Sequence, residues 1–245
     1  MPSADPAGDR LPVEPAQARA TLETGAWFRT IPAELQQWLL DHAVLRSLEA
    51  GERLFSRGDP PGGLYGVVRG AVRVTGVSAD GKEALLTLIE PPHWFGEIAL
   101  FDGLPRTHDA VADVPTQVLQ VPQGPLAQLL EAQPRLWRAF GALLAHKVRL
   151  AFVAMEDTAL LPAATRIARR LLLIAGDYAD PYAAAGARGR TLIAVRQEQL
   201  AMMLSLSRQT TNQILRDLEE RGIARLTRGE IEIIDFQGLR AAASL

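Results

Sequence analysis

Residues 197–235 read QEQLAMMLSLSRQTTNQILRDLEERGIARLTRGEIEIID. Apolar residues at helical spacing predict two short helices, 197–204 and 208–221, separated by only a few residues. Leu200 and Leu204 would face a shared core from the first helix, and Leu215 and Leu218 from the second. Two β-rich runs, 224–227 and 230–235, follow with a turn between them and predict a hairpin. The stretch is therefore typical of a winged helix-turn-helix, whose second helix can enter the major groove of DNA.

The second of these helices carries a polar face that suits a DNA groove. Ser207 can cap the helix by accepting a hydrogen bond from an early backbone amide. Hydrogen-bonding groups then follow with no acid before Asp217, and donors and acceptors of this kind read base edges. A solvated face on an ordinary helical hairpin is the alternative. The predicted DNA contacts are Ser207, Arg208, Gln209, Thr210, Thr211, Asn212, Gln213 and Arg228, with Thr210, Thr211 and Arg228 expected to touch phosphate.

N-terminal to this stretch, a helix is predicted to begin at Pro162. The winged helix-turn-helix domain is therefore predicted to span residues 161–245. Residues 134–160 before it form a longer helical pattern. Apolar or small residues recur there at alternating three- and four-residue steps, close to the heptad seam of a dimerisation helix. A helix lying on the core of its own domain remains the alternative. The seam positions are Trp137, Gly141, Leu144, Val148, Ala151, Met155 and Thr158.

Residues 26–133 form the next predicted domain. Short β-rich runs separated by Gly and Pro extend from Leu45 to Val121, which is typical of a β-sandwich or barrel. A helix over residues 33–42 should pack on it. Residues 1–25 are rich in Pro, Ala and Asp and are predicted to be a mobile tail.

One segment of the β-region, FGEIALFDGLPRT at residues 95–107, carries the residue types of a phosphate site. Gly96 lets backbone approach a ligand, and Glu97 can accept from a sugar hydroxyl. Arg106 offers a planar fork to a phosphate, with the Thr107 hydroxyl beside it. A buried Glu97–Arg106 ion pair in a domain that binds nothing is the alternative.

Composition limits the other possibilities. The 245 residues are 48% apolar and 22% charged, with a net charge of −2 and no Cys. From Ala159 onward, 12 Arg against 9 acidic residues give +3, which permits a DNA-binding C-terminus. The apolar runs are too short to span a bilayer, so a cytoplasmic location is expected. Neither a metal site nor a catalytic constellation is predicted, since the four His show no ligand spacing.

The string from Gln197 to Thr210, together with residues 215–223, resembles the helix-turn-helix of the Crp/Fnr family of transcription regulators. The segment Phe95–Thr107 resembles the phosphate-binding cassette of cyclic-nucleotide-binding domains. The resemblance covers about residues 45–235 and implies an α+β chain: a jelly-roll domain, a dimerisation helix and the winged helix-turn-helix.

The resemblance also implies a function. The chain would bind a palindromic operator on double-stranded DNA as a homodimer joined through the long helix, with RNA polymerase as a partner and no membrane. A small ligand such as cyclic AMP would act as allosteric effector, with Gly96, Glu97, Ile98, Arg106 and Thr107 as its site.

The resemblance assigns roles residue by residue. Arg208 occupies the position of the family's guanine reader. Gln209 and Gln213 stand where a Glu and a second Arg are usual, so we expect a half-site that keeps a guanine but is richer in A·T. Val195 stands where a capping Thr is common, and Val cannot cap.

In the effector domain, His108 replaces a small residue after the Arg-Thr pair. Ala151 and Phe152 stand where the best-known cyclic-AMP receptor has adenine-reading hydroxyls, so we expect weak or altered purine selectivity.

Two further functions stay open on sequence alone. One is a regulator of the same type that needs no nucleotide, and calorimetry with cyclic AMP and cyclic GMP would separate it. The other is a cyclic-nucleotide module that docks on a protein partner. Its binding would lack the steep salt dependence of binding to duplex DNA.

Overall fold

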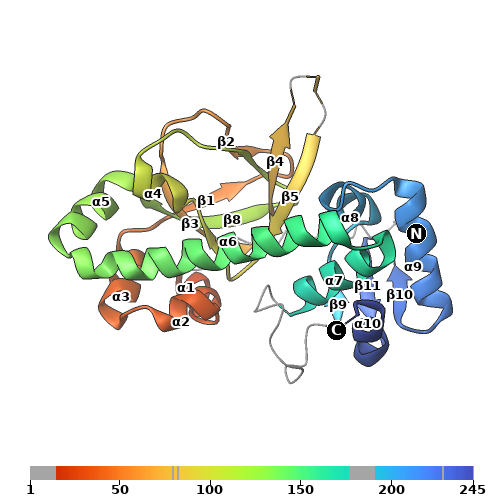
Figure 1. Cartoon of the computed structure of the whole chain (residues 1–245). Coiled ribbons are helices and arrows are strands. Elements are labelled where there is room, and N and C mark those ends of the chain that lie inside the picture. The colour runs from red at the N-terminus through yellow and green to blue at the C-terminus, as the bar shows by residue number, and fades with distance from the viewer. Residues whose placement is uncertain (1–14, 79, 82, 177–190, 228, 245) are drawn as a thin grey trace, which may run out of the picture. The chain divides into compact units, whose positions relative to one another are not determined.

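The computed structural model describes residues 15–78, 80–81, 83–176, 191–227 and 229–244. These residues form two compact units (Figure 1). Unit 1 contains the described residues of 1–78 and 87–144, and unit 2 contains those of 79–86 and 145–245. No helix in these described ranges is both long and apolar enough to cross a bilayer.

Unit 1 is built on two four-stranded sheets, except that residues 83–86 of β5 are assigned to unit 2. Their facing sides enclose a core that includes Val67, Val72 and Val118, so the predicted jelly-roll sandwich is confirmed. The first sheet has the order β1 (Val44–Leu48), β8 (Thr116–Pro122), β3 (Gly63–Arg69), β6 (Trp94–Phe95), and the second β2 (Arg53–Phe55), β7 (Asp109–Ala112), β4 (Val72–Val77), β5 (Glu83–Ile89).

A layer of helices covers the outer side of the first sheet. Leu64 and Val121 of that sheet are fully buried against this layer, where Leu126 and Phe140 also lie. Strand β3 is consequently buried on both sides, which explains why its sequence is a continuous apolar run rather than an alternating one. The helices of unit 1 are α1 (Pro15–Glu23), α2 (Ala26–Thr30), α3 (Ala33–Asp41), α4 (Ile98–Asp102), α5 (Gln123–Ala132), the 3-10 turn Pro134–Leu136, and the first part of α6 (Trp137–Leu160).

The prediction of a mobile tail over residues 1–25 is wrong for its second half. Helix α1 begins at Pro15, and Ala18 and Leu22 are completely buried in the helical layer of unit 1. A helix of nine residues is marginal alone, so this burial is what stabilises it. Residues 1–14 lie outside the described residues.

Unit 2 packs four helices and a small sheet around one core. Ile167 and Leu171 of α7 (Ala163–Ala175), Leu200, Leu215 and Leu239 are all fully buried in it. The other elements are β9 (Leu192–Ile193), α8 (Gln197–Met203), α9 (Arg208–Glu220), β10 (Ala224–Thr227), β11 (Glu230–Ile233) and α10 (Phe236–Ala242), with sheet order β10-β11-β9. The predicted helix-turn-helix and wing are confirmed.

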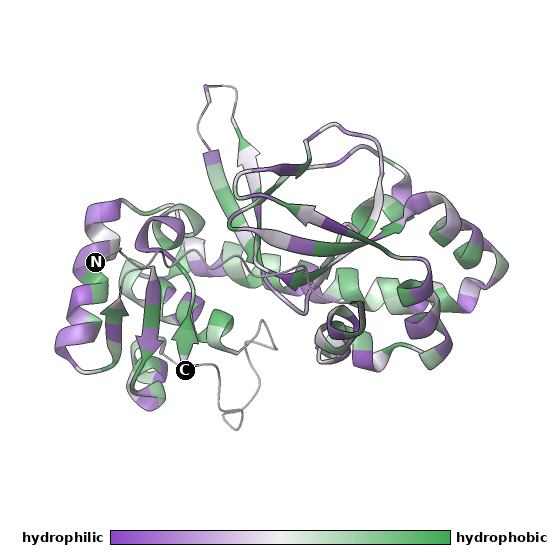
Figure 2. Ribbon diagram, turned by 180° about the vertical axis from the view of Figure 1, so that it is seen from behind, coloured by the Kyte–Doolittle hydropathy of each residue, from purple (hydrophilic) through white to green (hydrophobic). Residues whose placement is uncertain are grey.

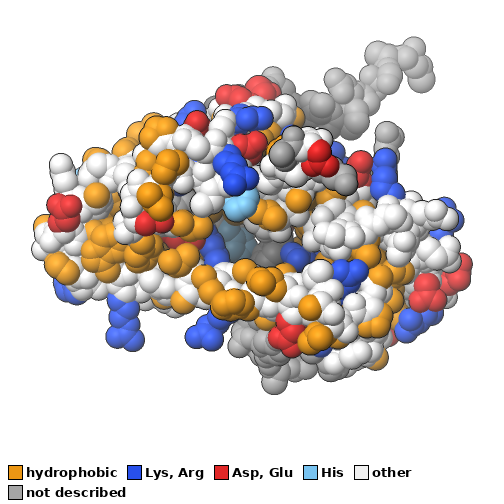
Figure 3. All heavy atoms as spheres, turned by 45° about the horizontal axis from the view of Figure 1, so that its top comes forward, with side chains coloured by type: hydrophobic (Ala, Val, Ile, Leu, Met, Phe, Trp, Pro, Cys, Tyr) orange, Lys and Arg blue, Asp and Glu red, His pale blue; other side chains and the backbone are white. Residues whose placement is uncertain are grey.

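Helix α6 changes character along its 24 residues. Phe140 and Leu143 in its first half are buried in the core of unit 1. Its second half instead exposes apolar side chains: Val148 is 42% exposed, Phe152 64% and Met155 66%. Figure 3 shows hydrophobic side chains in orange along this side of the molecule. Part of the predicted seam is therefore accessible on the chain.

Candidate nucleic-acid interface and effector site

The turn between α8 and α9 is closed by backbone hydrogen bonds. The Leu206 amide donates to the Ala201 carbonyl at 2.9 Å, and the Ser205 amide donates to the Met202 carbonyl at 3.3 Å. Ser205 has a positive φ of 52°, the left-handed conformation that ends helices in this way. Ala201 is 2% exposed, so its small side chain lets the two helices approach. The contacts within the α8–α9 turn thus set the angle between these two helices.

Ser207 caps α9 as predicted. Its Oγ accepts a hydrogen bond from the Thr210 amide at 2.9 Å, and its backbone is extended at φ −69° and ψ 149°. The cap satisfies an amide that would otherwise lack a helical partner. The cap therefore fixes the backbone of Arg208 as the first residue of α9.

The start of α8 differs from the expectation that Val195 occupies its cap position. The N-cap is Arg196, whose backbone amide donates to Gln199 Oε1 at 2.9 Å. Val195 is 2% exposed and packs in the core of unit 2. Its apolar side chain is therefore a core residue, and α8 still begins at Gln197 as predicted.

The face of α9 that carries the predicted base-reading residues is accessible. Arg208, Gln209, Thr210 and Gln213 are exposed, and Asn212 is half-buried. In Figure 2 the ribbon of α9 is mostly purple, marking hydrophilic residues. An accessible row of donors and acceptors on one helix is what insertion into a groove requires.

The structure contradicts the predicted phosphate contact of Thr211. Its side chain is completely buried, and its hydroxyl has no hydrogen-bond partner among the described residues. The reason is helical periodicity, since Thr211 lies four and seven residues before the buried Leu215 and Leu218. Thr211 is therefore a core residue of unit 2. Arg228, also expected to touch phosphate, lies outside the described residues.

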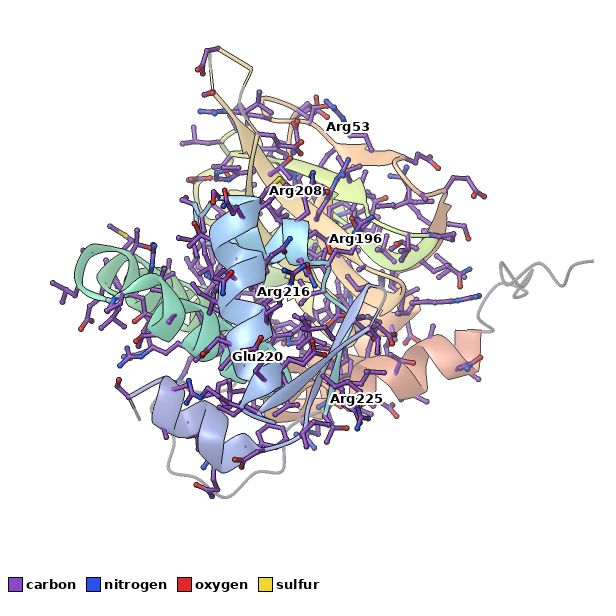
Figure 4. The ribbon with its side chains drawn as sticks, turned by 90° about the vertical axis from the view of Figure 1, so that its right-hand side faces the viewer. Arg53, Arg196, Arg208, Arg216, Glu220 and Arg225 are labelled. Carbon is purple, nitrogen blue, oxygen red and sulfur yellow. The ribbon has the colours of Figure 1, made fainter. Side chains whose placement is uncertain are left out.

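Three further arginines lie around α9 and were missed by sequence reasoning. Figure 4 shows Arg196, Arg216 and Arg225 around this helix, coming from the segment before α8, from α9 itself and from β10. All three are exposed. Arg225 donates to Glu232 Oε2 on the paired strand at 2.7 Å. A signal for Arg216 existed in the sequence, because it follows Asn212 by four residues and so continues the same helical face.

In unit 1, Gly63 and Gly96 lie against Arg106 of the segment Phe95–Thr107, and we call this arrangement the cradle. Gly96 has a φ of +97°, and a Cβ there would lie 2.9 Å from the Gly63 carbonyl oxygen and 3.1 Å from Arg106 Nη1. Only glycine fits without strain. Helix α4 (Ile98–Asp102) follows, with Glu97 as its N-cap and Gly103 as its C-cap. Glu97 is 2% exposed, whereas Ile98 is 45% exposed.

Arg106 holds this cradle together. It is 6% exposed, and it donates from Nη1 to the Gly96 carbonyl at 3.0 Å and from Nη2 to the Gly63 carbonyl at 2.7 Å. Its guanidinium lies 4.6 Å from the centre of the Phe55 ring. Burial lowers its pKa from the usual value, and Tyr65, Glu97 and Asp59 oppose that shift. The Arg106 guanidinium thus donates hydrogen bonds to backbone carbonyls, so a Glu97–Arg106 ion pair is not all that holds it.

Thr107 and His108 follow Arg106 and hydrogen-bond to each other. His108 Nδ1 is 2.9 Å from Thr107 Oγ1. Burial lowers the pKa of His108 below its usual value, and the nearby Arg57 lowers it further, while Asp109 opposes the shift. His108 is half-buried, and its hydrogen bond to Thr107 places its imidazole beside the hydroxyl that is predicted to bind phosphate.

The cassette also contacts α6 within unit 1. Phe101 of α4 and Trp137 in the first turn of α6 have ring centres 5.1 Å apart. The Phe101–Trp137 contact therefore joins α4 directly to α6. Separately, the Trp27 indole of α2 donates to the Ala139 carbonyl of α6 at 2.8 Å.

Two family descriptions match the chain. A cyclic nucleotide-binding domain matches residues 45–133, and a Crp-like helix-turn-helix domain matches residues 165–242. Together they contain both sites described above. The chain belongs to the Crp/Fnr family of DNA-binding transcription regulators.

Individual relatives agree with this assignment. The chain is 28% identical over 193 residues to the CRP-like cAMP-activated global transcriptional regulator of Mycobacterium tuberculosis, covering 79% of this chain and 85% of that protein. It is 29% identical over 206 residues to the cyclic AMP receptor protein of Thermus thermophilus, covering 84% and 91%. The Crp-like DNA-binding domain disfavours the alternative of a module that docks on a protein.

Solved structures share the fold. FixK2 from Bradyrhizobium japonicum superposes with a TM-score of 0.71 at 24% identity, covering 82% of this chain and 96% of that one. A CRP/FNR family transcriptional regulator from Thermus thermophilus superposes with a TM-score of 0.63 at 25% identity, covering 82% of this chain and 99% of that one. Both domains thus lie in the order that the sequence predicts.

Proposed function

We propose that this regulator acts in the cytoplasm as a homodimer on a two-fold symmetric operator, and that a cyclic nucleotide bound in unit 1 controls its DNA affinity. RNA polymerase would be a partner at the promoter. The observation that carries DNA reading is the capped, exposed N-terminus of α9, where Arg208 is 72% exposed in its side chain. An arginine fork at this place suits O6 and N7 of guanine.

The exposed apolar residues of α6 support the homodimer. Val148, Phe152 and Met155 follow one another at four- and three-residue steps, so they form one stripe. A stripe of this spacing packs against a second copy of itself in a coiled coil. Two recognition helices would then reach half-sites one turn of DNA apart, roughly 34–36 Å.

The buried Arg106 supports a nucleotide effector. Two of its donors are held by Gly63 and Gly96, yet its Nε lies buried without a hydrogen-bond partner among the described contacts. A buried donor left over in a glycine-lined cradle fits an anionic ligand such as a cyclic phosphate. Thr107 would add its hydroxyl, and Glu97 would accept from the ribose.

The ligand would act through its preference for one arrangement of the protein. Binding shifts an equilibrium only by the difference in affinity between its two states. The Phe101–Trp137 contact gives the cassette a route to α6 within unit 1.

A DNA-binding selection with and without cyclic AMP tests the proposal. We expect enrichment of a palindromic site, with affinity that changes with the nucleotide and falls steeply with salt. Calorimetry with cyclic AMP and cyclic GMP measures effector binding separately. Sequence-specific DNA binding that neither nucleotide changes, together with no heat of nucleotide binding, would indicate a regulator of this type that needs no nucleotide effector.

A further inference from the structure

A carboxylate of α8 lies against the arginine at the start of α9. Glu198 Oε2 is 3.2 Å from Arg208 Nη2, and the two side chains are 53% and 72% exposed. Figure 4 labels Arg208 at the end of α9. An ion pair this exposed adds little to stability. The property that it can change is the orientation of the Arg208 side chain.

Orientation matters because guanine recognition uses two parallel N–H groups of a planar fork. The Ser207 cap fixes the backbone at Arg208, but the long side chain keeps its own rotational freedom. A carboxylate that accepts from Nη2 restricts that freedom and leaves other N–H groups of the fork available.

Glu198 is suited to this role by its place in the chain. It is the only acidic residue between residues 197 and 216, so the reading face of α9 supplies no carboxylate of its own before Asp217. It also lies in the first turn of α8, where a negative charge is favoured by the helix dipole.

We propose that Glu198 is a positioning residue for base reading: it holds the Arg208 guanidinium in the orientation that recognises guanine. This role rests on the proposed use of α9 as the reading helix. A purely repulsive effect of Glu198 on phosphates would have the opposite signature, because removing the charge would then strengthen binding to every sequence alike.

The test compares DNA preferences of full-length variants. A selection with the wild type and with Arg208→Ala identifies the base position that depends on Arg208. Dissociation constants are then measured for the selected site and for the site with that base pair changed. We expect Glu198→Gln to reduce the preference at this position about fivefold, as partial loss of a bidentate contact would. Affinity for unrelated duplexes should change little.

Two controls make the result specific. Glu220→Gln removes the same charge from the other end of α9 and should leave the preference unchanged. In the Arg208→Ala background, Glu198→Gln should have no further effect on that position. An unchanged preference in Glu198→Gln, with uniformly tighter binding to all duplexes, would overturn the positioning role. Absence of sequence-specific DNA binding by the wild type would instead overturn the proposed function.

Discussion

Arg106 and Arg208 mark the two proposed sites of this regulator, and the surroundings of the two side chains are opposite. Arg106 is 6% exposed, donates to two backbone carbonyls and lies over the Phe55 ring. The Arg208 side chain is 72% exposed and has one carboxylate beside it. The cradle is therefore built around Arg106, whereas Arg208, the proposed DNA-reading arginine, lies exposed on the protein surface. Substitutions in the cradle should cost stability, and substitutions on the reading face should cost recognition.

The largest effect on folding should come from Arg106→Leu. It leaves the Gly63 and Gly96 carbonyls buried without their donor, and we expect a loss of about 3 kcal/mol in the free energy of unfolding. Arg208→Leu should cost less than about 0.5 kcal/mol, because its side chain is exposed. Urea unfolding of both variants measures the difference. Equal losses would remove the contrast between the two sites.

The backbone of the cradle should respond next. Gly96→Ala forces a Cβ to within 2.9 Å of the Gly63 carbonyl oxygen at a φ of +97°, and we expect a loss of about 2 kcal/mol. Gly103→Ala is the matched control, since its φ is also positive but no atom lies within 4 Å. It should cost about 1 kcal/mol. A control that is as damaging as Gly96→Ala would show that close approach is unimportant.

On the DNA side, the buried hydroxyl of Thr211 should affect stability and not DNA recognition. Thr211→Val replaces a buried hydroxyl that lacks a partner with a methyl group, so we expect stability to rise by up to about 1 kcal/mol. DNA affinity should stay the same. Thr210→Val, at an exposed position, should weaken DNA binding with little effect on stability. Thermal unfolding and DNA titration of the pair check this, and a loss of affinity in Thr211→Val would restore its predicted contact.

The smallest effect concerns pH and the cradle. Because the pKa of His108 is lowered in the folded protein, the unfolded chain binds more protons near and below pH 6.5. Stability should therefore fall as pH drops through the usual His pKa toward the folded value. His108→Asn should flatten this slope. Unfolding curves of the wild type and the variant between pH 5 and 8 measure the two slopes. An unchanged slope in His108→Asn would contradict this assignment.

Local signals explain what could be predicted from the sequence. The two helices expected at 197–204 and 208–221 are observed as Gln197–Met203 and Arg208–Glu220. Their bounds follow from a helical period, a cap and a tight turn, all of which are short-range. The buried Thr211 could have been found by extending the same period one turn toward the N-terminus.

Long-range contacts explain what could not be predicted. Helix α1 is stabilised by burial of Ala18 and Leu22 against distant parts of unit 1, and its own sequence has no strong apolar period. The carbonyl partners of Arg106 are 43 and 10 residues away, so its type suggested a phosphate fork but not the backbone cradle that holds it. Glu198 likewise meets Arg208 only because the α8–α9 turn brings them together.

Arg208 at the start of α9 is the residue proposed to read guanine. A binding selection on the wild type and on Arg208→Ala tests this role. We expect the wild type to select a palindrome whose half-site contains a guanine, and Arg208→Ala to lose that preference, at a cost of roughly 1–3 kcal/mol, while keeping the other positions. Retention of the complete wild-type preference by Arg208→Ala would show that Arg208 does not read the site.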